Sequence, residues 1–86
     1  MPRALTVKRT VVPRSGRGEY LGRLRERKAY YKRAGCSFWV CEEAGLPGAF
    51  VEFTEAPAAR TLAAAHAAAP EPPLDAHRIY LEVELS

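Results

Sequence analysis

The side chain best suited to chemistry in this 86-residue chain is His66, one of two histidines. It follows Leu62 by four residues in an alanine-rich stretch, so a helix there would place both on one inward face. An imidazole in that position could carry a proton or contact a ligand. The alternative is a structural role, with the histidine at the edge of the core and its outer nitrogen in water. His66 is the candidate catalytic residue, and the sequence leaves the catalytic group undetermined.

Two tyrosines and a cation share one stripe of an earlier helical segment. Tyr20 and Tyr31, with Arg27 nearby, could bring hydroxyls and a positive charge to a cleft that binds an acidic or phenolic compound. They could equally be tyrosines at the edge of the core and a cation whose stem covers apolar surface. Space beneath the alanine-rich helix would form a pocket lined by Leu62, His66, Phe53 and Tyr31. The candidate ligand-binding residues are Tyr20, Arg27, Tyr31, Trp39, Phe53 and Leu62.

Trp39 could stack on an aromatic ligand, or it could fill the core or a contact between subunits. Other site chemistries lack their residues, because there is no nucleophile triad, metal-ligand spacing or phosphate-binding loop. We therefore expect no metal and no cofactor. Cys36 and Cys41 lie five residues apart and cannot bridge in an extended strand, so both are expected to be reduced core thiols. No apolar run approaches the length of a membrane span, and we expect a cytoplasmic protein without membrane contact.

The elements that must position these residues follow from periodicity and from turn residues. Helical spacing predicts helices over 17–34 and 58–68, the first ended by Gly35. Alternating or β-branched runs predict strands over 5–12, 36–41, 49–55 and 77–85. With right-handed crossovers, this order predicts one α+β domain over residues 1–86. It is a ferredoxin-like βαββαβ plait with antiparallel sheet order 4-1-3-2 and both helices on one face.

The side of the sheet away from the helices needs a cover. We expect Leu5, Val7, Val51 and Phe53 to face the helices, together with Ile79, Leu81, Val83 and Leu85 of the last strand. Phe50, Glu52 and Tyr80 would then lie on the open side, with Lys8 within reach of Glu52 and Glu82. Either Trp39 or Phe38 must also emerge there. A face with several aromatic residues predicts a two-fold homodimer through the open sheet face.

Binding to nucleic acid is the least favoured of the functions considered. Residues 1–33 hold eleven of the thirteen Lys/Arg and only two of the ten acids, which is one pattern typical of such surfaces. Ala49–Phe53 also matches the second half of the RNA-recognition octamer. However, Leu46, Pro47 and Gly48 occupy the positions of the basic residue, the glycine and the stacking aromatic, so the part that contacts RNA is largely missing.

The chain resembles the dimeric α/β barrels that include the antibiotic biosynthesis monooxygenase-like proteins. The resemblance rests on element order, on the hairpin from Phe38 through Leu46-Pro-Gly48 to Glu55, and on the following helix with Leu62 and His66. It implies an eight-stranded barrel built by two subunits, with a ligand cleft between each sheet and its helices. Haem degradation is not expected, because Thr54-Glu-Ala-Pro57 replaces that group's Trp and the chain contains no Asn.

Two hypotheses follow from this resemblance. The first is a small-molecule-binding protein similar to cofactor-independent monooxygenases that act on aromatic or polyketide-like compounds. The second is a non-catalytic dimeric module that senses a ligand or serves assembly, since a fold does not determine a function. A cavity that reaches His66 and Tyr31 would favour catalysis, and a closed, dry core would disfavour it.

Overall fold

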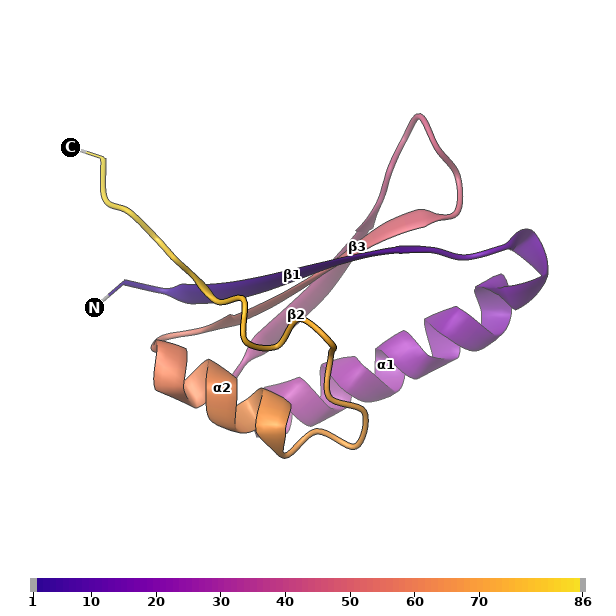
Figure 1. Cartoon of the computed structure of the whole chain (residues 1–86). Coiled ribbons are helices and arrows are strands. Elements are labelled where there is room, and N and C mark those ends of the chain that lie inside the picture. Colours follow the sequence, from indigo (N-terminus) through magenta and orange to yellow (C-terminus); the bar gives the residue numbers. More distant parts are fainter. Residues whose placement is uncertain (1, 86) are drawn as a thin grey trace.

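The computed structural model describes residues 2–85 as one sheet with helices packed on a single face (Figure 1). The strands are β1 (Ala4–Val11), β2 (Ser37–Glu42), β3 (Ala49–Ala56) and β4 (Tyr80–Leu81). The helices are η1 (Arg14–Gly16), a short 3-10 turn, followed by α1 (Arg17–Arg33) and α2 (Ala59–Ala67). Both α-helices therefore lie within one or two residues of the predicted ranges. Within residues 2–85, no helix is both long enough and apolar enough to pass through a membrane.

The sheet is antiparallel, and its strands are ordered β2-β3-β1-β4. This is the predicted order 4-1-3-2 read from the opposite edge. The two longest strands, β1 and β3, pair along their full lengths at the centre of the sheet, with Lys8 opposite Glu52 and Val7 opposite Phe53. A four-stranded antiparallel sheet with two helices in this order is compatible with a ferredoxin-like fold.

Each helix packs one face of buried residues against the sheet. Tyr20, Leu24 and Tyr31 are the buried residues of α1, at the spacing of one helical face. In α2 the buried residues include Leu62 and His66, four positions apart. Gly35 ends α1 in the left-handed region at φ 81°, while the amide of Cys36 donates to the Tyr31 carbonyl at 2.8 Å.

The prediction of which residues of β1 and β3 face the helices is wrong, whereas Tyr80 of β4 lies on the side away from the helices as predicted. Thr6, Phe38, Phe50, Glu52 and Thr54 are buried beneath the helices. Since residues paired across strands share a face, the alternate set lies on the opposite side. We call that side the open face, and it comprises Leu5, Val7, Arg9, Ser37, Trp39, Cys41, Val51, Phe53, Glu55 and Tyr80.

Aromatic contacts with α1 explain why the helices cover the face opposite the open face. The Tyr20 ring lies 4.9 Å from that of Phe50, and the Tyr31 ring stacks on Phe38 at 5.6 Å and 11°. These contacts hold Phe38 and Phe50 against α1, and the polar residues Thr6, Glu52 and Thr54 of the same sheet face are buried with them. The same alternation separates the cysteines, because Cys36 is buried whereas Cys41 is exposed, which corrects the prediction of two core thiols.

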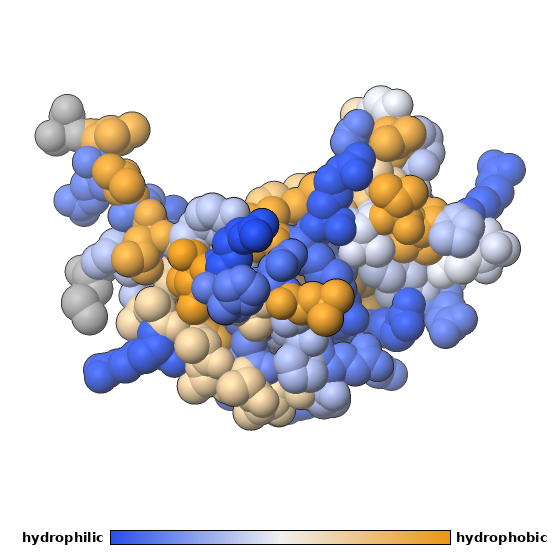
Figure 2. Space-filling model, in the orientation of Figure 1, coloured by the Kyte–Doolittle hydropathy of each residue, from blue (hydrophilic) through white to orange (hydrophobic). Residues whose placement is uncertain are grey.

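The last strand is much shorter than predicted. Only Tyr80 and Leu81 pair with β1, and the amide of Glu82 makes a final bond to the Arg3 carbonyl at 2.9 Å. Val83 and Leu85 are 74% and 93% exposed instead of facing the helices. Figure 2 shows this C-terminal segment projecting at the upper left, with hydrophobic and hydrophilic residues in alternation.

Candidate functional site

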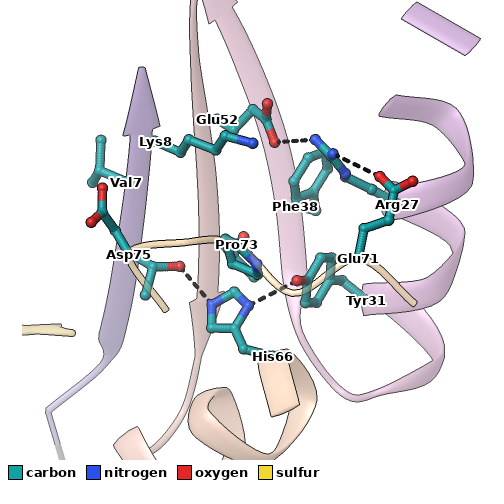
Figure 3. Close-up of a pocket in the computed structure, with 12 residues that line it drawn as sticks. Val7, Lys8, Arg27, Tyr31, Phe38, Glu52, His66, Glu71, Pro73 and Asp75 are labelled. Atoms are coloured by element: carbon teal, nitrogen blue, oxygen red, sulfur yellow. Dashed lines mark hydrogen bonds and ion pairs between the residues drawn. The ribbon is translucent and has the colours of Figure 1, made fainter. Parts of the chain in front are cut away.

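A histidine lies at the centre of a buried polar layer between the sheet and the helices. His66, from α2, is 2% exposed. Its Nε2 lies 2.8 Å from the Thr6 hydroxyl of β1, and its Nδ1 lies 2.8 Å from the Tyr31 hydroxyl of α1. Figure 3 shows these hydrogen bonds reaching the imidazole from the sheet side and from the helix side. Three elements that are far apart in the sequence therefore meet at one ring.

Burial determines the charge state of this group. It lowers the pKa of His66 below its ordinary value, so the imidazole is neutral near pH 7. Burial also raises the pKa of Tyr31 to about 12, so that hydroxyl keeps its proton. A neutral imidazole donates from one nitrogen and accepts at the other, so one of the two hydroxyls donates to the ring and the other accepts from it. The three side chains form a neutral hydrogen-bonded chain.

A second polar group surrounds Glu52, which is 5% exposed. Its Oε2 accepts a hydrogen bond from the Tyr20 hydroxyl at 2.8 Å, and its Oε1 accepts one from Arg27 Nη1 at 2.9 Å. Burial, with the hydrogen bond to Glu52, raises the pKa of Tyr20. The other terminal nitrogen of Arg27 reaches the Glu71 carboxylate at 3.4 Å. The buried carboxylate is thus neutralised by a cation that also contacts the surface.

Lys8 lies beside Glu52 as predicted, but on the covered face instead of the open one, and it does not make the predicted ion pair. It lies opposite Glu52 in the sheet register, on the covered face, yet Arg27 pairs with that carboxylate. Glu82, its other predicted partner, pairs with Arg3 at 3.0 Å. Among residues 2–85, Lys8 has no ion-pair partner within 4.0 Å. The amine is therefore an uncommitted positive charge beside the buried layer.

The polar layer encloses a small cavity that reaches His66 and Tyr31. Its volume is about 30 Å³, which is room for little more than a water molecule. Thr6, Phe38, Glu52 and Thr54 contribute to its walls. Its cover comes from residues 70–76, which we call the strap. Glu71, Pro73 and Asp75 of the strap line the cavity, and Figure 3 shows Pro73 lying across the region between His66 and Tyr31.

A larger groove lies next to this cavity. Its volume is about 160 Å³, and it is lined by side chains of α1 and by the chain that leaves α2. The lining residues are Arg23, Glu26, Arg27, Tyr30, Tyr31, Ala69, Pro70 and Glu71. Because Arg27, Tyr31 and Glu71 line both spaces, the ion pair between Arg27 and Glu71 lies where cavity and groove meet.

The structure brings together four of the predicted site residues: Tyr20, Arg27, Tyr31 and His66. The other three lie elsewhere. Trp39 and Phe53 stack on each other on the open face, with ring centroids 5.2 Å apart, so neither lines the cavity. Leu62 is fully buried in the core and does not reach the cavity either.

Sequence reasoning missed Thr6 and treated Glu52 as a residue of the outer surface. The pattern that could have identified them is the polar alternation in both central strands, Thr6-x-Lys8-x-Thr10 and Glu52-x-Thr54. When two central strands each carry a polar stripe, antiparallel pairing places the stripes side by side. The alternation alone does not say which face the helices cover.

The chemistry available to this site is the binding of polar groups and the movement of protons. Residues 2–85 contain no cluster of three or more His, Cys, Asp or Glu side chains that could hold a metal ion. The neutral imidazole of His66 could accept a proton at its unprotonated nitrogen, relayed through the hydroxyl that donates to it. Comparisons of the chain with protein-family models, with curated proteins and with solved structures found no match.

Proposed function

We propose that this protein is a homodimer that binds a small aromatic compound in the polar layer between its sheet and its helices. The observation that carries the proposal is the burial of His66, Glu52, Thr6 and Thr54 around one cavity. The resemblance to monooxygenase-like dimeric barrels agrees with a ligand in this position.

A buried polar layer lowers the free energy of unfolding compared with an apolar core. A domain of this size is stable by only about 5–15 kcal/mol. A buried ion pair such as Glu52 with Arg27 is often no better than well-packed apolar residues of similar volume, and is sometimes worse by about 1–4 kcal/mol. A core selected for stability alone would be apolar here. Polar side chains gathered around a cavity therefore favour a binding site.

The composition of the cavity wall suggests the kind of ligand. Tyr31 and Phe38 present aromatic surface, whereas Thr6 and His66 present hydroxyl and imidazole groups. A compound with one aromatic ring and one or two oxygen substituents would satisfy both types of surface. The strap must shift to admit it, because the enclosed volume is only about 30 Å³.

Binding can be tested by recording amide ¹H–¹⁵N spectra while 1-naphthol or hydroquinone is added. We expect saturable shifts at Thr6, Tyr31 and His66, and their loss in Thr6→Val, which replaces a wall hydroxyl by a methyl group of similar size. The matched control is Thr61→Val, which changes a hydroxyl of α2 that does not line the cavity. Shifts that are absent with both compounds at millimolar concentration, or that persist unchanged in Thr6→Val, would contradict the proposed site.

The homodimer rests on the open face. Its central row is Val7 and Phe53, which are half-buried, and Trp39, which is 41% exposed; Tyr80, 50% exposed, lies on the edge strand opposite Leu5. Charged residues stand on either side of the central row, Glu55 opposite Leu5 and Arg9 opposite Val51, and each pairs with a neighbour, Glu55 with Arg3 and Arg9 with Glu43. An apolar centre with a charged periphery is the composition of a protein interface.

A second copy of the sheet is the occupant that fits this face best. The molecule measures 41 × 32 × 19 Å, so its broad side exceeds the area of about 800 Å² that each partner contributes to a stable interface. Two four-stranded sheets packed on each other would form the eight-stranded barrel that the resemblance implies. Trp39, stacked flat on Phe53 at 11°, offers a continuous aromatic surface for such packing.

Sedimentation velocity at micromolar concentration tests the dimer. We expect a mass of twice 9.5 kDa for the wild type and a monomer for the double variant Trp39→Ser/Phe53→Ser. The control is Leu46→Ser, which removes a similarly exposed apolar side chain, 44% against 41%, from the β2–β3 turn. A monomeric wild type, or a double variant that dimerises as the control does, would refute the assembly.

Oxidation of the bound compound without a cofactor is a second candidate function, favoured by the neutral His66 beside the cavity. A neutral imidazole is able to take a phenolic proton, which is the step that makes such compounds reactive toward oxygen. If His66 serves this step, His66→Gln should lower oxygen consumption with hydroquinone by about 100-fold or more. A rate that is equal in the two proteins would leave the protein as a binding module.

A further inference from the structure

Glu71 of the strap pairs with Arg27, the cation that lies where the cavity and the groove meet. Arg27 lies between two acids: Glu52 on the inside, at 2.9 Å, and Glu71 of the strap on the outside, at 3.4 Å. Figure 3 shows the guanidinium reaching both carboxylates from α1. Because Arg27 and Glu71 line both the cavity and the groove, their contact lies where the two spaces meet.

The outer contact is the weaker of the two. The Glu71 side chain is 67% exposed, so water screens the pair and can replace it at little cost. The Glu52 side chain is only 6% exposed and has no such replacement. Arg27 therefore keeps its inner partner whenever the strap moves, and the outer side of the guanidinium becomes free to bind another acceptor.

Charge around this point favours an anion once Glu71 has left. Arg23 lines the groove, and Lys8 lines the cavity. Neither has an ion-pair partner within 4.0 Å among residues 2–85. The acids that balance these cations from outside are Glu26 of α1 and the strap residues Glu71 and Asp75. Displacing the strap removes negative charge and leaves the cations in place.

The groove beside Arg27 offers an aromatic wall. Tyr30 and Tyr31 meet edge to face, with centroids 5.0 Å apart, and the Tyr30 hydroxyl donates to the Ala65 carbonyl at 2.6 Å. The tyrosine rings are therefore held in place before a ligand arrives. A volume of about 160 Å³ lies below the range of about 300–1,000 Å³ typical of sites for drug-sized ligands, and so suits a compound with a single ring.

From these observations we propose that the site takes a small aromatic carboxylate, whose acid group replaces Glu71 on Arg27 while its ring lies against Tyr30 and Tyr31. The inference rests on the proposed function, extends its site from the cavity into the adjoining groove and specifies its ligand class. A planar guanidinium can form two parallel hydrogen bonds to a carboxylate, which the long single contact from Glu71 does not achieve. Glu71 acts as an internal competitor that a better-placed carboxylate displaces.

Sodium benzoate and benzyl alcohol form a matched pair of probes, because they share the ring and differ in the charged group. Titrations followed by amide ¹H–¹⁵N spectra at constant ionic strength should show benzoate shifting Tyr30, Tyr31 and Ala69, with benzyl alcohol binding more weakly. Glu71→Gln should tighten benzoate binding roughly two- to fivefold, because it removes the competing carboxylate. It should leave benzyl alcohol binding unchanged.

Glu43→Gln is the matched control, since Glu43 is an exposed acid in a similarly long ion pair, 3.5 Å to Arg9, outside both spaces. Benzoate binding that tightens in Glu71→Gln and not in Glu43→Gln supports the inference. Equal affinity for the two probes, or no effect of Glu71→Gln, overturns it but leaves the proposed binding of a neutral aromatic intact. If 1-naphthol, hydroquinone, benzoate and benzyl alcohol all fail to bind, both proposals are refuted.

Discussion

The ion pair between Arg27 and Glu52 allows a quantitative test of the buried polar layer. The perturbation is Arg27→Met, which keeps most of the side-chain volume and removes the charge. The Glu52 carboxylate, whose side chain is 6% exposed, would then retain only the hydrogen bond from Tyr20. Removing one member of a buried pair typically costs about 3–5 kcal/mol, because the remaining charge is uncompensated.

The companion variant Glu52→Gln should be much milder. Its amide oxygen can still accept the hydrogen bond from Tyr20, and Arg27, 22% exposed, can be solvated, so we expect a loss of about 1 kcal/mol. The double variant Arg27→Met/Glu52→Gln contains no buried charge at this position. Its free energy of unfolding should therefore lie within about 1 kcal/mol of the wild type, which gives a coupling energy of at least about 3 kcal/mol.

Urea denaturation at pH 7 and equal protomer concentration measures these free energies of unfolding, with melting temperatures as a second readout. For a domain of this size, each kcal/mol corresponds to a shift of about 4–8 °C. Arg25→Met is the control, because Arg25 is an exposed arginine of the same helix without an ion-pair partner among residues 2–85. If Arg27→Met costs no more than Arg25→Met, or if the double variant is as unstable as Arg27→Met, the reasoning about buried charge is refuted.

Three further predictions concern the packing of the domain. Burial lowers the pKa of His66 below 6.5, so the stability linked to it is complete above pH 6.5 and falls as the pH drops below that value, by at most about 1.4 kcal/mol per pH unit. Urea titrations of His66→Gln should lack this slope. Gly48→Ala would place a Cβ 2.8 Å from the Val12 carbonyl oxygen at φ 96°, and should lower the free energy of unfolding by about 1–3 kcal/mol, whereas Gly45→Ala, with open space around it, should not. Tyr31→Phe leaves Nδ1 of the buried imidazole without its partner and should cost about 1–3 kcal/mol by the same urea assay, and a cost near zero would show that another group satisfies that nitrogen.

The sequence predicted those residues of the candidate site that lie on helices. Tyr20, Arg27, Tyr31 and His66 were identified because a helical period of 3.6 residues places such residues on one stripe. Thr6 and Glu52 were not assigned to that site, since a strand period of two sorts residues into two sets without saying which set the helices cover. Hydropathy favoured the set with Leu5, Val7 and Phe53, and that is the set the helices leave uncovered.

Glu52 can lie beneath the helices only because residues distant from it in the chain bind its carboxylate. Its carboxylate is buried because Tyr20 and Arg27 reach it from α1, 32 and 25 residues away. That same arrangement turned Phe53 and Trp39 outward, where they stack on the open face. An apolar set can be left outside when the polar set inside is fully hydrogen-bonded, and within residues 2–85 no buried side-chain nitrogen or oxygen lacks a partner.

The sequence by itself determined the element order, the strand order and nearly all the element bounds, because these follow from local periodicity and from turn residues such as Pro13 and Gly35. Only the tertiary structure decided which face is covered, where the last strand ends and which cation neutralises Glu52. The sequence pattern of 77–85 alternates throughout, yet only Tyr80 and Leu81 of this stretch pair with β1. Local preferences depend on neighbouring residues, whereas the satisfaction of a charge or of a strand edge depends on partners that only the folded chain brings close.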